Sequence, residues 1–426
     1  MTKKLPLWRG AFLSVLRGMP WTRCGARRRA RGVPYVQARF AWGNRRLIAY
    51  LAFLSAFAPL STDMYLPALP HMAEALDTSY SLAGLTVSSF MLLFALSMLV
   101  WGPLSDKYGR RPVLLTGSAL YVLSSVCIAL AASIGPLLFW RGLQAVGSGA
   151  VSAMSLAVVK DILRGKAMEK VVTWIQTVTI LAPMLAPVAG GGLLLFTDWR
   201  GIFWCLAACG LLALAGGLAL RETRAVATQG SVFRALGRIF VVLRTPGFGA
   251  PLLLFSAMSM PFMAYLAVSS YVFQSRFGLS AQEYSWFFAF NAGMSLLGPL
   301  LHMRLFRHWR RDAVIAAHLL LVCLAGGLLL LFGDSGPWRF ALLYVPISFC
   351  GSAIRPPSTV LLMNCVRGDN GAVTSLINSG ALLCGSFSML LCSLPFWDGA
   401  VTAAGAISCL TAGTALLGWL RLTRGA

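Results

Sequence analysis

The sequence predicts an all-α integral membrane protein with twelve transmembrane helices. Of its 426 residues, 58% are hydrophobic and only 12% are charged, and the mean hydropathy is +0.75. Soluble domains of this length are far less apolar. Uncharged apolar runs of about 20 residues, each long enough to cross ~30 Å of hydrocarbon, recur along the chain. The expected spans are 47–66, 82–101, 113–134, 136–158, 171–196, 201–220, 249–273, 284–303, 313–333, 338–363, 371–394 and 399–420.

The positive charges indicate how these spans are oriented. Lysine and arginine total 36 against 13 acidic residues, a formal net charge of +23. Such an excess alone would suggest nucleic acid as a partner. With the N-terminus inside, however, the outer loops hold only Arg200, Arg276 and Arg339, and nearly all other positive charges fall on the inner side, as the positive-inside rule requires. We therefore expect a multi-pass protein of the inner (cytoplasmic) membrane, surrounded by the lipid bilayer, with both termini cytoplasmic and no nucleic-acid partner.

Residues 1–46 are basic, contain no acidic residue and lack the apolar core of a secretory signal. An Arg-rich leader of this kind also suits an organelle transit peptide, although Ser14 is its only serine. We expect a disordered cytoplasmic tail that touches anionic lipid headgroups.

A short polar segment, 102–112, separates the second and third spans. Its glycines permit tight turns and close helix approach. Its order resembles the loop between helices two and three of the major facilitator superfamily. The resemblance implies the major facilitator fold and a conformational gate in which the aspartate docks against the N-terminus of the eleventh helix, here near Asn370. The matching gate residues are Gly102, Asp106, Gly109, Arg110 and Arg111.

Asp63 is the only acidic residue inside any expected span. A carboxylate at membrane depth costs about 2.5–3.5 kcal/mol on insertion scales, so it usually faces a cavity and has a function. Burial favours the protonated form, which suits a proton carrier. The alternative is a side chain that snorkels to the outer interface. The segment 61–70 resembles the first-helix signature of the bicyclomycin and chloramphenicol resistance (Bcr/CflA) branch of drug/proton antiporters.

In the fourth span, Arg141, Gln144, Gly147 and Gly149 resemble a superfamily pattern in which Ala145 replaces one glycine. The resemblance implies a proton-coupling role for Arg141, whose permanent charge would tune a nearby carboxylate. A headgroup contact is the alternative for this arginine.

The fifth span carries two prolines four residues apart, which share one helical face, followed by a glycine run that permits close contact and bending. The order of these residues resembles the antiporter signature of drug exporters, in which Ala186 takes the place of the first glycine. A packing role alone is the other interpretation. The residues concerned are Pro183, Pro187, Gly190 and Gly191.

The chain is expected to divide into two homologous halves. Residues 47–220 would form the first six-helix bundle, 221–247 a cytoplasmic linker and 248–426 the second bundle. A degenerate copy of the loop motif supports this division. It begins at Gly298 and continues through Arg304, Arg307, Arg310 and Arg311, with His302 in place of the aspartate.

Several side chains are candidates for substrate contact. Most aromatic residues in the seventh and eighth spans would be packing or lipid-facing, but a few are expected to line an apolar pocket. Arg355 lies beside a pair of prolines. It is interpreted either as a second coupling or substrate group or as a side chain that points to the cytoplasm. The candidates are Tyr65, Gln144, Phe262, Tyr265, Asn291 and Arg355.

The expected function is proton-coupled efflux of small, rather apolar, drug-like compounds by alternating access, through a monomer. A transporter of a neutral metabolite, such as a sugar, nucleoside or amino acid, is the alternative. The sequence has no zincin motif, no nucleophile elbow and no paired carboxylates within a span. We therefore expect no enzyme activity, no cofactor and no metal; the partners are substrate, protons and lipid.

Overall fold

The computed structural model is built from helices, and no strand occurs among the residues it describes. All of these residues belong to one compact unit, Ala38–Ala426. The described residues are 44–223, 237, 241–245, 247–306, 308–366, 370–394 and 397–424. Most of the expected tail (1–46) and linker (221–247) therefore lies outside them.

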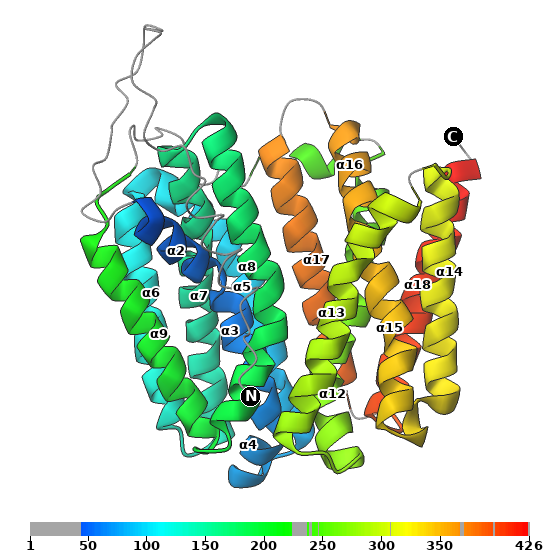
Figure 1. The fold of residues 1–426 in the computed structure, drawn as a ribbon, viewed down its shortest axis with the longest axis horizontal. Helices are drawn as coiled ribbons and strands as arrows, with labels where there is room; N and C mark the ends of the chain where they lie inside the picture. Colours follow the sequence, from blue (N-terminus) through cyan, green and yellow to red (C-terminus); the bar gives the residue numbers. More distant parts are fainter. Residues whose placement is uncertain are drawn as a thin grey trace, which may run out of the picture. The chain divides into compact units, whose positions relative to one another are not determined.

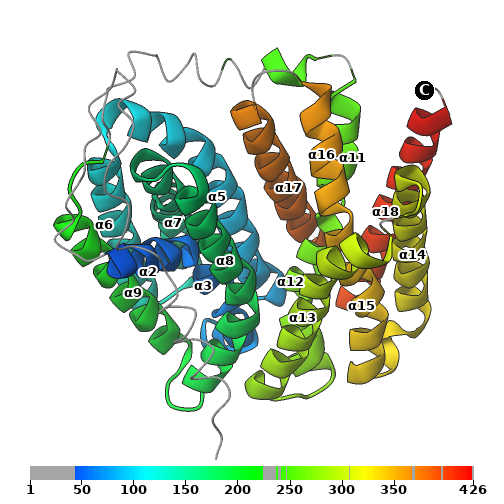
Figure 2. The ribbon, with the colours of Figure 1, turned by 45° about the horizontal axis from the view of Figure 1, so that its top comes forward.

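The helices of the first half lie together on one side of the unit, and those of the second half lie on the other (Figures 1 and 2). The first half contains α2 (Asn44–Ser55), α3 (Phe57–Asp63), the 3-10 helix η1 (Leu66–Ala68), α4 (Leu69–Ala75), α5 (Tyr80–Tyr108), α6 (Arg110–Ala129), α7 (Ile134–Ile162), α8 (Gly165–Leu193) and α9 (Trp199–Ala219).

The second half repeats this order of long helices. It contains α11 (Gly249–Ala257), α12 (Met260–Tyr271), the π-helix η2 (Val272–Arg276), α13 (Ala281–Leu305), α14 (Arg311–Phe332), η3 (Gly333–Ser335), α15 (Pro337–Ala353), α16 (Arg355–Cys365), α17 (Asn370–Cys392) and α18 (Ala400–Arg424).

Among the described residues, nine helices are long and apolar enough to cross a membrane, and ten if the bent pair 46–55 and 57–75 counts as one span. The two other expected spans correspond to α13 and to α15 with α16. The sequence of α13 includes polar residues such as Asn291 and His302. The other span is broken at Ile354 into helices of 17 and 11 residues. The all-helical fold is confirmed.

Beyond the bend between α2 and α3, prolines interrupt the first span a second time, after Asp63. Pro67 and Pro70 have no N–H, so the carbonyls of Asp63 and Leu66 lose their i+4 donors. The chain tightens into η1 instead, where the Leu69 N–H bonds the Leu66 carbonyl. The consequence is that α3 ends at Asp63.

Small residues bring the helices of each half into close contact. A Cβ on Gly147 of α7 would lie 2.7 Å from the carbonyl oxygen of Gly117 in α6. In the second half, a Cβ on Gly326 of α14 would lie 2.6 Å from the backbone nitrogen of Cys409 in α18. Backbones this close leave no room for a larger residue, as is typical of packed membrane helices.

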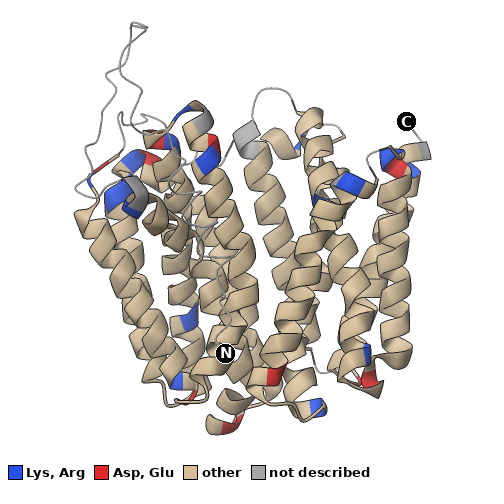
Figure 3. Ribbon diagram, viewed as in Figure 1, with Lys and Arg blue, Asp and Glu red and all other residues tan. Residues whose placement is uncertain are grey.

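Lysine and arginine gather at the end of the helices where the C-terminus lies, and few appear at the opposite end beside α4 (Figure 3). We call these the inner and outer ends, following the charge bias.

Candidate functional site

Asp63 is enclosed by protein, with 3% of its surface exposed. Its Oδ1 accepts a hydrogen bond of 2.9 Å from the Thr62 hydroxyl. Among the described residues it forms no ion pair. The burial argues against a side chain that snorkels to the interface. A carboxyl group buried with so little support is suited to holding a proton.

Arg141 is fully buried in an aromatic cage on α7. Its guanidinium carbon lies 4.5 Å from the ring centre of Phe90, 4.9 Å from that of Tyr65 and 5.6 Å from that of Phe203. Such contacts stabilise a cation away from water. This enclosure argues against a headgroup contact.

The hydrogen bonds of Arg141 lead to the helix that carries Asp63. Its Nη1 donates to the Ser61 carbonyl (3.1 Å) and to Gln144 Oε1 (2.7 Å). Its Nε and Nη2 are buried without a hydrogen-bond partner among the described residues. The structure thus brings Arg141 to the backbone beside Asp63 without pairing the two charges.

Residues that the sequence did not single out complete this network. Gln144 Nε2 donates to the Ser125 hydroxyl (2.7 Å), and the hydroxyls of Ser61 and Tyr121 lie 2.6 Å apart. The candidate Tyr65 is fully buried, and its hydroxyl donates to the Met72 sulfur. Serines and aromatic residues occur in most spans, so no sequence signal distinguishes Ser125 or Tyr121.

The inner loop is held by carboxylates. Arg110 Nη1 pairs with Asp106 (2.6 Å), and its Nε pairs with Asp161 (2.8 Å). The oxygens of Glu222 accept the backbone N–H groups of Arg110 (3.0 Å) and Arg111 (3.1 Å) at the start of α6. A carboxylate at a helix N-terminus satisfies unpaired donors and the helix dipole. No sequence pattern predicted that Asp161, after the fourth span, and Glu222, at the start of the linker, take part in this loop.

The loop glycines differ from one another. Gly109 has a φ of +108°, and a Cβ there would collide with Glu222 Oε2, so glycine is required. A Cβ on Gly102 would meet no atom within 4 Å, which corrects the expectation of a close helix approach there in this conformation. The side chain of Asn370 lies outside the described residues, so docking of Asp106 against it stays a prediction.

The glycines of α8 lie where α8 meets two other elements. A Cβ on Gly190 would collide with the Met64 carbonyl, and one on Gly191 would lie 2.5 Å from Ser285 Oγ of α13. The Ser285 hydroxyl also donates to the Pro187 carbonyl (2.8 Å). Pro183 lies one turn earlier in the same helix. This end of α8 therefore fastens the first half to the second.

Two further bonds between the halves lie at the outer end. The Ser270 hydroxyl donates to the Leu66 carbonyl (2.5 Å), and Gln274 Nε2 donates to the Pro67 carbonyl (3.1 Å). Within the described residues, the hydrogen bonds that cross between the halves lie towards this end. The structure is therefore closed on its outer side.

The second half contains a buried pair of polar groups. The Tyr265 ring centre lies 4.7 Å from that of Tyr344 and 5.6 Å from that of Phe288. The Tyr265 hydroxyl and both polar atoms of Asn291 are buried without a hydrogen bond of ordinary geometry to the described residues. A ligand that supplies the missing hydrogen-bond partner would therefore bind with a favourable free energy at these groups.

Two other candidates are less enclosed. Phe262 is partly buried and packs on the core. Arg355 is the first residue of α16 and its surface is exposed, so both interpretations of it, a coupling or substrate group and a side chain pointing to the cytoplasm, stay predictions.

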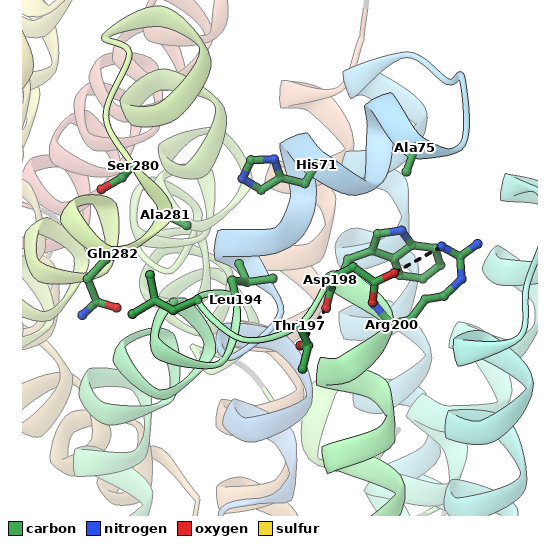
Figure 4. Close-up of a pocket in the computed structure, with 12 residues that line it drawn as sticks. His71, Ala75, Leu194, Thr197, Asp198, Arg200, Ser280, Ala281 and Gln282 are labelled. Atoms are coloured by element: carbon green, nitrogen blue, oxygen red, sulfur yellow. Dashed lines mark hydrogen bonds and ion pairs between the residues drawn. The ribbon is translucent and has the colours of Figure 1, made fainter.

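A cavity of about 420 Å³ lies at the outer end (Figure 4). Both halves line it. Two of its polar atoms, Gln282 Oε1 and Trp199 Nε1, are buried without a hydrogen-bond partner among the described residues, whereas others bond to near neighbours. Asp198 lies 3.7 Å from Arg200, and Ser280 caps α13 in a reciprocal arrangement with Glu283. No motif or pattern in the sequence indicated this cavity. Its lining includes His71, Ala75, Gly191, Leu194, Thr197, Asp198, Arg200, Ser280, Ala281 and Gln282.

The sequence profile of the Major Facilitator Superfamily matches residues 51–389. The chain belongs to this superfamily. It is therefore a multi-pass membrane transporter for small molecules rather than an enzyme.

Relatives of this major facilitator chain include proteins named for drug resistance. It is 30% identical to the chloramphenicol resistance protein of Pseudomonas aeruginosa, over 89% of this chain and 91% of that one. It is 27% identical to the bicyclomycin resistance protein homolog of Haemophilus influenzae, over 69% and 75%. It is 33% identical to the uncharacterized transporter YdgK of Bacillus subtilis, over 60% of this chain and 65% of that one, which is just under two thirds.

Solved structures share the fold. A D-xylose–proton symporter aligns over 88% of this chain and 97% of its own, with a TM-score of 0.67 and 16% identity. An inward-facing bacterial homolog of the human lysosomal transporter Spinster aligns over 89% and 97%, with a TM-score of 0.72 and 13% identity. At these identities the likeness concerns the fold alone.

Proposed function

We propose that this transporter exports small, rather apolar, drug-like compounds in exchange for protons. The observation that carries the proposal is Asp63, a buried carboxyl group that ends α3 and forms no ion pair among the described residues. It lies at the break in the first span, directly before the segment that bonds to the second half. A proton carrier needs such a place, because its access must change when the halves move.

The proposed cycle uses Asp63 and Arg141 in different roles. Asp63 binds a proton when the outer side is open and releases it when the inner side is open. Arg141 keeps its charge inside the aromatic cage and sets the field at the end of α3. One charge moved through 100 mV is worth about 2.3 kcal/mol, and one pH unit about 1.4 kcal/mol. Together they sustain a roughly 500-fold gradient of a neutral solute.

Alternating access requires a closure at each end. The outer closure is formed by the contact of α8 with α13 through Gly191 and Ser285. The proposed inner closure uses Asp106 and Arg110, which in this structure are bonded within the first half. The free space at Gly102 would admit a helix of the second half when the inner side closes.

The names of the relatives support a drug-like substrate. The proposed contacts come from both halves and combine aromatic surface with few polar groups, as small-molecule sites commonly do. They are Tyr65, Gln144, Phe262, Tyr265, Asn291 and Arg355. Tyr265 and Asn291, whose buried polar atoms have no hydrogen bond of ordinary geometry among the described residues, also favour a second candidate, a neutral metabolite that forms hydrogen bonds.

We further propose the inner membrane as the location, with both termini cytoplasmic, as the charge bias indicates. The bundles would be 47–220 and 248–426, joined by 221–247, and the protein would act as a monomer. Structurally, α2 begins at Asn44, slightly before the first expected boundary.

The test uses inverted membrane vesicles with an imposed proton gradient. Uptake of labelled chloramphenicol and of a cationic dye is compared between the parent protein and Asp63→Asn. We expect parent uptake to stop with a protonophore and with Asp63→Asn. The control is Asp77→Asn, which removes an exposed carboxylate at a φ of +46° that asparagine tolerates. Unimpaired uptake by Asp63→Asn would contradict the proposed coupling residue. If neither compound moves, the metabolite candidate replaces drug export.

A further inference from the structure

Ser270 and Gln274 lie on the seventh span, far in sequence from Asp63, and both bond to the segment that follows it. Pro70 has no N–H, so the Leu66 carbonyl lacks its i+4 helical donor. The Ser270 hydroxyl bonds to that carbonyl (2.5 Å), and this contact is buried. Gln274 Nε2 bonds to the Pro67 carbonyl (3.1 Å) and also to the Ser270 hydroxyl (2.9 Å). Pro70 thus leaves the Leu66 carbonyl, which already accepts the Leu69 N–H, open to a second donor from the seventh span.

The backbone connects these bonds directly to Asp63. α3 ends at Asp63, and η1 begins at Leu66. A movement of η1 away from the seventh span therefore moves the end of α3 and uncovers the carboxyl group. The outer cavity reaches His71 on α4, shortly beyond η1, so outside water is already close when the junction is closed.

We propose that Ser270 and Gln274 are positioning residues that hold η1 against the second half and so control the access of external protons to Asp63. This inference rests on the proposed proton coupling. The closed junction buries the carboxyl group and favours its neutral form, whereas ionisation favours opening, because the carboxylate gains water. Protonation and outer closure are therefore linked.

Other titratable groups face this region and set the background of its pH response. Arg141 of α7 bonds the Ser61 carbonyl, and Tyr121 of α6 bonds the Ser61 hydroxyl. Tyr284 of α13 lies within electrostatic range of Asp63.

The experiment measures opening of the outer side without any substrate. The reporter is Ser285→Cys, because Ser285 of α13 is buried and its hydroxyl bonds the Pro187 carbonyl of α8 in the closed junction. Right-side-out vesicles are treated with a membrane-impermeant maleimide, and labelling of the same proteins without the reporter is subtracted. Ser270→Ala and Gln274→Met each remove one bond across the junction. Ser269→Ala is the matched control, because Ser269 is equally buried but bonds Tyr284 within the second half (3.2 Å).

We expect Ser270→Ala and Gln274→Met to speed labelling by about threefold to tenfold each, the population shift expected for one lost hydrogen bond. Ser269→Ala should leave the rate near that of the parent. If neither variant speeds labelling, or if Ser269→Ala does so equally, the proposal is wrong.

The pH profile tests the link to Asp63. The rate at each pH is divided by that of the denatured reporter protein, because the thiol itself reacts faster as it ionises. The normalised labelling of the parent should speed up as external pH rises, and Ser270→Ala should move the midpoint to lower pH, because a weaker closed state permits ionisation earlier. Asp63→Asn should abolish the dependence. An unchanged midpoint in Ser270→Ala would mean that the bonds only hold the halves together, which overturns the proposal. Labelling that behaves as expected while vesicle uptake fails would reject drug export and leave this inference standing.

Discussion

The inner loops of the two halves share a sequence pattern but are built differently. In the first half, Arg110 bonds Asp106 and Asp161, while Glu222 caps α6. In the second half, His302 replaces the aspartate, and its ring centre lies 5.4 Å from that of His318. Arg307, which the sequence also assigns to this copy of the motif, lies outside the described residues.

The first glycine of the motif has different surroundings in the two loops. Gly102 has free space around it, whereas a Cβ on Gly298 would collide with the Phe349 carbonyl and Ser352. The first loop is thus a charged junction with room for movement, and the second is a packed junction of rings and close backbones. We infer that the first loop changes its contacts during transport and the second stays fixed.

Loss of the central guanidinium should have the largest effect. Arg110→Met leaves Asp161, whose side chain is 20% exposed, without its cation, and we expect a loss of about 3 kcal/mol in the free energy of unfolding. Arg304→Met, at an exposed arginine of the second loop, should cost about 0.5 kcal/mol or less. Thermal unfolding in detergent compares them, and equal losses would remove the contrast between the loops.

The glycine contrast gives the next largest effect. Gly298→Ala should destabilise the protein by about 1–3 kcal/mol, because backbone atoms block the new methyl group. Gly102→Ala should be neutral or slightly stabilising, since alanine favours the helix. The same melts measure both. If Gly102→Ala keeps stability but slows transport, the glycine is needed in the other conformation; unchanged transport would argue that Gly102 takes no part in closing.

Replacing His302 by the aspartate of the motif should lower the free energy of unfolding. His302→Asp places a carboxylate against Phe306 and His318, and we expect a loss of about 1–2 kcal/mol. His302→Phe should be tolerated, because the ring contacts remain. Unfolding of the two variants at one pH is the measurement. A stabilising His302→Asp would show that the second loop can hold a charged junction after all.

The smallest effect concerns the cap of α6. Glu222→Gln removes the charge that faces the first N–H groups of this helix. We expect the free energy of unfolding to fall by about 0.5–1 kcal/mol, and by less in high salt. Denaturant unfolding at low and high salt measures this, with Glu283→Gln at the start of α13 as the matched cap of the second half. A loss that does not respond to salt would point to hydrogen bonding rather than charge.

Much of the fold followed from the sequence because its signals are local. Apolar length identified most of the spans, and charge bias indicated which ends are inner. Asp63 and Arg141 stood out as charges within apolar runs. The same reasoning left two interpretations of Arg355 open, because a charge in an apolar run indicates depth along the helix but not the direction in which the side chain faces.

The sequence by itself therefore determined the membrane class, the superfamily and the two unusual charges, since each depends on composition or on residues close together in the chain. Only the tertiary structure decided what those charges touch. The cage around Arg141, the carboxylate of Glu222 at α6 and the bonds of Ser270 and Gln274 to η1 join residues from distant helices. Serine, glutamine and phenylalanine carry no signal of such partners, because contacts between helices are set by how the helices pack rather than by spacing along the chain.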